Sequence, residues 1–359
     1  MNNKKQVSTI SSEQFRRWAK PRRGAANPEV ITNTVWVELI KTNHWPHKAH
    51  KLYGSGEKQS PGWCFDRYGK SDTILPDGTT VYIGGEHEDY YDEDFYIYND
   101  VIVKALQGEI IIYSYPEDVF PPTDSHTATL VGNKIYIIGC IGYPEQRDYS
   151  DTPVYVLSLK DYSIEKLSTH GDAPHWLYKH KAKYIMGDNA IYCEYGEVQN
   201  TELNECVENL ATWRLCLKSG LWSCIEIKPW TRWRLARADE QRNHLYDIGS
   251  LESASRRQSE SKYDAETKAK LLALNYPLDF NKYKARYSPP IKHEIIESDE
   301  YRRHLILIDG VVICYDETSW GITVTIEGNL PATLISTLKS HSLTVFSEIE
   351  ATENKIIEL

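Results

Sequence analysis

A hairpin pattern that returns about every 54 residues limits this chain more than any other feature of its sequence. Residues 125–139 contain two runs of alternating apolar residues around Gly132-Asn133. Such alternation is the period of a strand with one buried face, and a Gly-Asn pair supplies the positive φ angles of a tight turn. The tyrosine of this hairpin has counterparts at spacings of 54, 56 and 54 residues: Tyr82, Tyr136, Tyr192 and Tyr246.

A second hairpin pattern lies between consecutive copies of the first. It is marked by two large apolar residues nine positions apart around a polar turn, namely Ile102 and Ile111, Tyr155 and Ile164, and Trp213 and Trp222. Trp36 and Trp45 repeat this spacing near the N-terminus, ahead of the first copy. One unit therefore contains two hairpins, or four short strands, in about 50 residues, which is the size of a propeller blade.

A third feature shares the same period. A proline precedes a basic residue by five or six positions just before each inner hairpin, in the pairs Pro61 and Arg67, Pro121 and His126, and Pro174 and His180. With these connectors and the double glycine Gly84-Gly85, the chain resembles the kelch-repeat family over about residues 35–250. The resemblance implies an all-β, kelch-like β-propeller of five or six blades. A β-sandwich or two smaller β domains is the alternative for so regular a set of strands.

The chain outside the repeats predicts two further segments at the N-terminal side. Residues 1–34 form a basic arm in which Ser11 and Gln14 predict a capping box for a short helix through Trp18. The arm is either a solvated tail or a segment that docks onto the acidic part of the chain. Residues 35–46 predict an outer hairpin that completes the last blade from the other terminus and so closes the propeller.

The C-terminal part predicts an insertion and a final blade. Residues 251–300 interrupt the pattern, and a helix is expected from Asp264 to Leu274. Residues 301–359 then supply the final blade, which starts with a hairpin at Asp309-Gly310 and continues with a strand at 322–326. A short helix from Pro331 to about Lys339 and a last strand at 343–346 complete the expected elements.

Charge and cysteine usage restrict the class of protein. The net charge is −10, and residues 71–103 contain nine acidic residues and no lysine or arginine. Such a balance disfavours nucleic acid as a partner.

The seven cysteines are dispersed without a Cys-x-x-Cys pair, which argues against a disulfide framework or zinc site. Without an apolar leader or a membrane-length segment, we expect a soluble cytoplasmic protein with no membrane partner and no cofactor.

The most unusual connection in the repeats alternates acids with aromatic residues. It could be a solvated acidic loop or, because carboxylates are hard oxygen donors, a Ca²⁺ ligand set, although no EF-hand pattern is present. The interpretation that we adopt is a docking surface for a basic protein, in which acids attract and aromatic residues anchor. The predicted partner-binding residues are Glu86, His87, Glu88, Asp89, Tyr90, Tyr91, Asp92, Glu93, Asp94 and Phe95.

A second candidate site is expected at the propeller axis. Arg67, His126 and His180 start equivalent strands, so propeller symmetry would bring them to one end of the axis as a pocket for a carboxylate or sugar acid, with Glu86 as a proton shuttle. The alternative is structural, with each side chain hydrogen-bonded to the backbone of the neighbouring blade.

The sequence contains no established catalytic fingerprint among those with a known spacing. We therefore expect a protein-binding propeller, such as a toxin-neutralising immunity protein or an adaptor, that recognises a basic partner through loops on one face. The alternative is a kelch-like enzyme of the epimerase or mutarotase type that acts on a small sugar or sugar acid in the axial pocket. Fold alone does not decide between the two.

Overall fold

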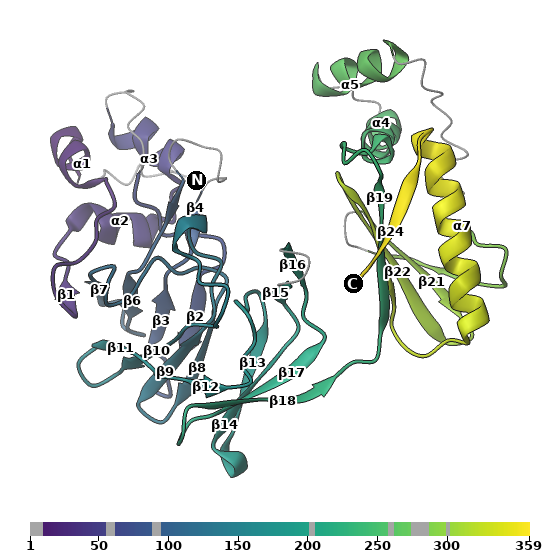
Figure 1. Cartoon of the computed structure of the whole chain (residues 1–359). Coiled ribbons are helices and arrows are strands. Elements are labelled where there is room, and N and C mark those ends of the chain that lie inside the picture. The colour runs from purple at the N-terminus through teal and green to yellow at the C-terminus, as the bar shows by residue number, and fades with distance from the viewer. Residues whose placement is uncertain are drawn as a thin grey trace, which may run out of the picture. The chain divides into compact units, whose positions relative to one another are not determined.

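A computed structural model describes residues 10–54, 62–87, 95–200, 205–257, 262–273, 287–298 and 302–359 (Figure 1). The chain forms two compact units, one up to Ile227 and one from Lys228 to Leu359. Residues 228–250, which we expected among the propeller blades, belong to the second unit. No helix in the described ranges has both the length and the apolar character needed to cross a membrane.

Three antiparallel sheets form the first unit, and each has two hairpins in the predicted order. In sheet 1, β2 (Ser71–Ile74), β3 (Thr80–Ile83), β6 (Val101–Lys104) and β7 (Ile110–Ser114) are neighbours in that order. Sheet 2 contains β8 (Thr127–Val131), β9 (Lys134–Ile138), β10 (Val154–Ser158) and β11 (Ile164–Lys166). Sheet 3 contains β13 (Lys181–Ile185), β14 (Ala190–Glu194), β17 (Ala211–Cys216) and β18 (Leu221–Ile227).

The prediction that the recurring tyrosine occupies an equivalent strand position is confirmed in these three sheets and is wrong in the fourth copy. Tyr82, Tyr136 and Tyr192 each lie in the second strand, opposite Asp72, Thr129 and Lys183 of the first. Tyr246 instead lies in the helix α4 (His244–Arg257). The chain is thus rich in antiparallel sheet, but the described residues contain three blade-like sheets and no closed propeller.

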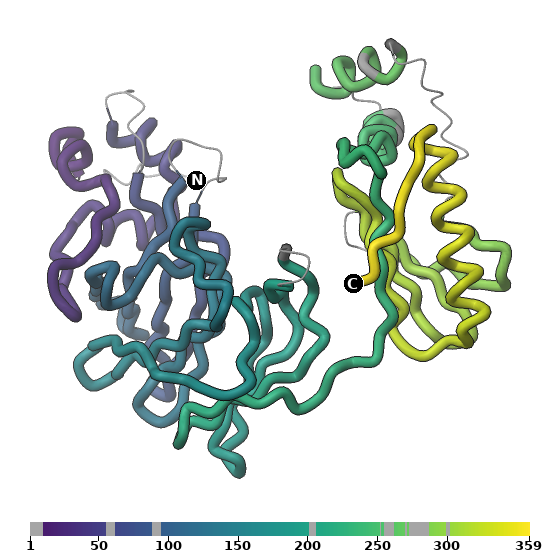
Figure 2. The backbone as a smooth tube through the Cα atoms, in the orientation of Figure 1, coloured from purple at the N-terminus to yellow at the C-terminus, as the bar shows by residue number. Residues whose placement is uncertain are grey.

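The sheets stack face to face through apolar side chains. Val81, Ile83 and Val103 of sheet 1 pack with Ile135 and Leu157 of sheet 2. The opposite face of sheet 2 packs against Ile191, Leu215 and Trp222 of sheet 3. Figure 2 follows the chain through the three sheets in sequence order, so each sheet is one stacked repeat.

Backbone hydrogen bonds also join the residues that precede the first strand of each sheet, β2, β8 and β13. The amide of Ser125 donates to the carbonyl oxygen of Gly69 at 2.7 Å, and the amide of Lys179 donates to that of Ser125 at 2.8 Å. All three residues have a left-handed backbone, with φ of 60°, 53° and 53°. Gly69, Ser125 and Lys179 are therefore structurally equivalent, and this equivalence fixes the register between the repeats.

Helices cover the free face of sheet 1, where closure had been predicted. They are α1 (Ser12–Trp18), α2 (Thr34–Thr42) and α3 (Pro46–Tyr53). Trp36, the first marker of the expected outer hairpin, lies in α2 and stacks on Trp63 with ring centroids 4.9 Å apart. The predicted hairpin at 35–46 is wrong, because Asn33 caps α2 through its side chain and the buried residues recur with helical spacing.

The N-terminal arm is docked rather than solvated. The predicted capping box between Ser11 and Gln14 is present in α1. Phe15 is 2% exposed and packs in the core with α2, and β1 (Glu29–Val30) pairs with β7 of sheet 1. Arg23 reaches the stem of the acidic connection, where it donates to the carbonyl oxygen of Ile97 at 2.9 Å.

The far face of sheet 3 ends the stack because it carries polar side chains. Lys183, Tyr192 and Arg214 lie side by side across β13, β14 and β17. Arg214 makes an ion pair with Asp188, and the Tyr192 hydroxyl donates to the same carboxylate at 2.8 Å. A helix layer at one end and a polar face at the other are the caps that let a stack of repeats remain open. A short parallel strand, β12 (His170–Gly171), adds to the outer edge at β18.

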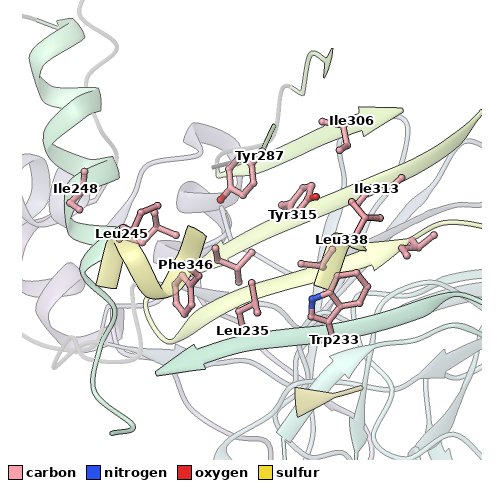
Figure 3. Packing of buried hydrophobic residues seen from close by; sticks show 14 of the residues in the cluster. Trp233, Leu235, Leu245, Ile248, Tyr287, Ile306, Ile313, Tyr315, Leu338 and Phe346 are labelled. Carbon is pink, nitrogen blue, oxygen red and sulfur yellow. The ribbon is translucent and has the colours of Figure 1, made fainter. Parts of the chain in front are cut away.

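The second unit is one six-stranded antiparallel sheet with helices. Its strand order is β20 (Glu294–Ile296), β21 (Arg303–Ile308), β22 (Val311–Thr318), β23 (Gly321–Ile326), β19 (Thr231–Arg237) and β24 (Asn354–Glu358). Figure 3 shows Leu338 and Phe346 of α7 (Ala332–Glu350) over Trp233 and Leu235 of β19. Leu245 and Ile248 of α4 join the same core.

Several local predictions for this unit are confirmed and one is wrong. The Asp309-Gly310 hairpin joins β21 to β22, the strand at 322–326 is β23, and the helix expected from Asp264 is α5 (Lys262–Ala273). The strand expected at 343–346 is part of α7. Its buried residues Leu338, Ser342, Phe346 and Ile349 recur every three or four positions, which is helical spacing.

Candidate functional site

Long connections between the second and third strands, which we call excursions, leave and rejoin each sheet at the same end of the three-sheet stack. They comprise residues 84–100, 139–153 and 195–210. Each begins where the second strand ends, which in an antiparallel hairpin is the end where the first strand begins. Two of them contain ribbons at equivalent places: β4 (Glu86–His87) with β5 (Tyr96–Ile97), and β15 (Glu197–Asn200) with β16 (Glu205–Glu208). Glu86 bridges to Tyr68 as Glu197 bridges to Tyr178, and Figure 1 shows β4 and β16 on the same side of the stack.

These excursions carry the excess negative charge of the chain. The first contains seven acidic residues and the third contains four, and neither has a lysine or arginine. The second, which includes the short 3-10 turn η1 (Pro144–Gln146), has three acids and Arg147. Fourteen acids and one cation therefore lie in the three excursions, against a net charge of −10 for the whole chain. One acid, Asp100, is buried. We call the end of the sheets at which these excursions begin and end the acidic face, after the other thirteen acids in their sequences.

The stem of the first excursion is held by aromatic contacts. The hydroxyl of Tyr143 accepts from the amide of Ile97 at 2.9 Å, and the ring of Phe95 meets that of Tyr143 edge-on at 5.8 Å. The Arg23 guanidinium lies 4.4 Å from the centre of the Tyr96 ring. Residues 88–94, which carry most of the predicted partner-binding positions, lie outside the described residues.

His87 was predicted to contact a partner, and the structure contradicts this. Its side chain is fully buried, and its Nδ1 lies 2.8 Å from the hydroxyl of Tyr98. Burial lowers the pKa of His87 to about 4, helped by the nearby Arg67 charge. His87 is therefore an uncharged core residue that orients the base of the ribbon.

An open hollow of about 630 Å³ lies where the first strands of the three sheets (β2, β8 and β13) begin, at the same end as the acidic face. Its lining includes two of the three residues predicted for an axial pocket, together with the predicted proton shuttle: His126, His180 and Glu86. Each imidazole bonds a hydroxyl of the preceding sheet. His126 Nε2 lies 2.7 Å from Ser71 Oγ, and His180 Nε2 lies 2.8 Å from Thr127 Oγ1. The structural role predicted for them is thus present, with a side-chain hydroxyl in place of the backbone.

Arg67 does not line the hollow, and its predicted equivalence with the two histidines is wrong. The backbone register places Lys70 at that position, one residue after Gly69, as His126 follows Ser125. Arg67 lies before β2, its side chain is fully buried, and it binds both carboxylate oxygens of Asp100, at 2.5 and 2.9 Å. The Lys70 Nζ donates to the carbonyl oxygen of Phe65 at 2.9 Å and lies over the Phe65 ring.

Acid should weaken the fold through these histidines. Burial lowers the pKa of both His126 and His180 to about 3, and the nearby His126 adds to the effect at His180. An unfolded histidine titrates near 6.5, so between about pH 6.5 and 3 the unfolded chain binds protons that the folded chain does not. The free energy of unfolding should therefore fall as the pH drops below about 6.5, by up to ~1.4 kcal/mol per pH unit for each buried histidine.

Urea unfolding of the wild type and of His180→Asn between about pH 7 and 5 measures this effect. The substitution removes one titrating group and keeps a polar side chain near Thr127, so the variant should show the shallower pH dependence. Equal pH dependence in the two proteins would contradict it.

Sequence reasoning missed the third excursion, although a signal was present. Residues 184–213 contain six acids and no lysine or arginine. It was not predicted to bind a partner because it lacks the clustered aromatic residues of the first excursion. Comparison with known proteins found no family model that matches the chain and no curated protein that matches its sequence.

Proposed function

We propose that this protein binds a basic partner protein through the acidic face of its N-terminal unit, as a toxin-neutralising immunity protein or an adaptor would. In this proposal the three stacked sheets are kelch-like blades that form an open array. The observation that carries it is the concentration of charge, since thirteen acids besides the buried Asp100 belong to excursions that begin and end at one end of the sheets. Complementary charge of this kind speeds encounter with an oppositely charged protein.

A second candidate is the sugar-acid enzyme, and the hollow with Glu86, His126 and His180 is the observation that favours it. The charges argue against it. Both imidazoles are neutral at physiological pH. Arg67 pairs with Asp100, Lys70 donates to the carbonyl oxygen of Phe65, and Lys179 pairs with Glu197 at 3.2 Å. Among the described residues that line the hollow, the cations are thus engaged by the protein itself, which suits an anionic substrate poorly.

The proposal is tested by binding kinetics against the partner captured by affinity from the native cell. Replacing Asp92, Glu93 and Asp94 together by Asn, Gln and Asn should lower the association rate constant by about five- to tenfold at low salt. Replacing Tyr91 by Ala should raise the dissociation rate constant by an amount corresponding to about 2 kcal/mol if that ring is an anchor.

The chain offers a matched control for the charge variant. Asp77, Glu109 and Asp161 are exposed and lie in turns at the opposite end of sheets 1 and 2. Replacing them by Asn, Gln and Asn removes the same charge, and the association rate should change much less than with the acidic-face variant. Equal effects of the two triple variants would show that net charge, not the acidic face, governs binding.

A further inference from the structure

The hollow at this end of the sheets has a wall that suits a positively charged side chain. Tyr68 is 62% exposed on its rim, and its ring lies 5.9 Å from that of Trp45. The Glu86 carboxylate side chain, the Ser125 residue and the apolar Ile141 also line the hollow. An exposed aromatic face, a carboxylate and an apolar wall are the groups that accept a cation and its aliphatic stem.

The floor of the hollow does not repel a cation. His126 and His180 are each less than a tenth exposed, and the Nδ1 of each has no hydrogen-bond partner among the described residues. Because burial keeps both imidazoles neutral, they add no positive charge to the floor of the hollow. The Lys70 ammonium donates to the carbonyl oxygen of Phe65 and lies near the rings of Phe65 and Tyr82.

Lys179 is the remaining cation in the lining, and an acid of the third excursion offsets it. Its Nζ lies 3.2 Å from Glu197 Oε1, and the Tyr178 hydroxyl donates to the other oxygen of the same carboxylate at 2.6 Å. The side chain of Lys179 is 56% exposed, so it lies at the rim rather than on the floor.

We infer that the hollow receives one arginine or lysine side chain of the basic partner, with Tyr68 against the cation and Glu86 as its counter-charge. This inference rests on the proposed function and names the anchor point within the acidic face. It also fixes the sign of two substitutions. Removing the acid at Glu86 should weaken binding of a cation, whereas removing the charge of Lys179 should strengthen it.

The probe is a short fluorescein-labelled peptide of Gly and Ser residues with one central Arg as its only cationic side chain, and its matched control carries citrulline, which has the same shape without the charge. Fluorescence anisotropy with the full chain should show that Glu86→Gln weakens the Arg peptide about tenfold and the citrulline peptide little. Lys179→Gln should tighten the Arg peptide about threefold. Tyr68→Ala should weaken it about fivefold, and Glu165→Gln, an exposed acid in β11, should have no effect.

Each other outcome overturns the inference and separates it from the proposed function. If Glu86→Gln and Tyr68→Ala leave affinity unchanged while the Asp92, Glu93, Asp94 triple variant weakens it, the acidic face binds cations but the hollow is not the anchor. If Lys179→Gln weakens binding, and a peptide with a central Glu binds more tightly than the Arg peptide, the hollow is an anion site. If the basic peptide does not bind the wild type, both the inference and the proposed function fail for this class of partner.

Discussion

Replacing Arg67 by Met should lower the free energy of unfolding by about 3–5 kcal/mol. The Arg67 side chain has no exposed surface, and that of Asp100 is 5% exposed. Besides the two bonds to Asp100, the Arg67 guanidinium donates to the carbonyl oxygens of Cys64 at 2.6 Å and Gly84 at 2.9 Å. Loss of the arginine leaves a buried carboxylate that, among the described side chains, keeps the Trp63 indole as a donor at 3.0 Å.

Urea unfolding measures this effect, and the chain contains a matched ion pair for comparison. Arg22 and Glu29 pair at 2.6 Å, but their side chains are 44% and 28% exposed. Replacing Arg22 by Met should therefore cost less than about 1 kcal/mol, because water screens the pair. The double variant Arg67→Met with Asp100→Leu should recover part of the loss, since it removes the stranded charge. Similar losses for Arg67→Met and Arg22→Met would refute the assignment of a buried ion pair.

Replacing Trp36 by Ala should lower the free energy of unfolding by about 3–5 kcal/mol, because the side chain fills the space between α2 and sheet 1. Trp36 is 1% exposed and packs with Ile102 and Ile112 of the sheet. Trp18, at the end of α1, is 39% exposed and serves as the control, for which Ala should cost less than about 1 kcal/mol. The comparison also tests the helical cap, since a flexible N-terminal segment would make the two losses equally small.

The hairpins of the first three repeats could be predicted from the sequence because local signals and packing agree there. Alternating apolar residues around Gly132 produce a strand pair whichever sheet covers it, and the same holds at Tyr82 and Tyr192. In the fourth copy, the local pattern around Tyr246 predicted a strand, but the residue lies in the helix α4. The Asn243 side chain accepts from the amide of Tyr246 at 2.9 Å, and Leu245, Ile248 and Leu251 face the core at helical spacing.

The site was predicted in part for a related reason. Counting residues from each proline aligned Arg67 with His126 and His180, but the backbone hydrogen bonds from Ser125 to Gly69 and from Lys179 to Ser125 shift that register by three residues. Such a shift depends on hydrogen bonds between neighbouring sheets. The spacing of residues within one repeat gives no information about those bonds. The two histidines and Glu86 were brought together correctly, because they lie at the ends of strands whose order the repeat already fixed.

The end of the stack could not be predicted from the repeat either. A period of 54 residues predicts the strands within one repeat. The number of repeats in the stack depends on what covers the free face of the first sheet and the free face of the last sheet. Here α2 covers sheet 1, and the far face of sheet 3 bears Lys183, Tyr192 and Arg214. A chain with these caps can stop at three sheets, whereas a closed ring needs apolar faces on both terminal blades.

The most direct test of the acidic face is the association rate constant of the wild-type chain with its captured partner, measured as a function of salt. Exposed charges are screened beyond ~8 Å at physiological ionic strength, so the rate should fall by about tenfold or more between about 50 and 300 mM salt. The dissociation rate should change far less, because short-range contacts govern it. An association rate that stays constant over this range would contradict a binding site built on the acidic residues of the three excursions.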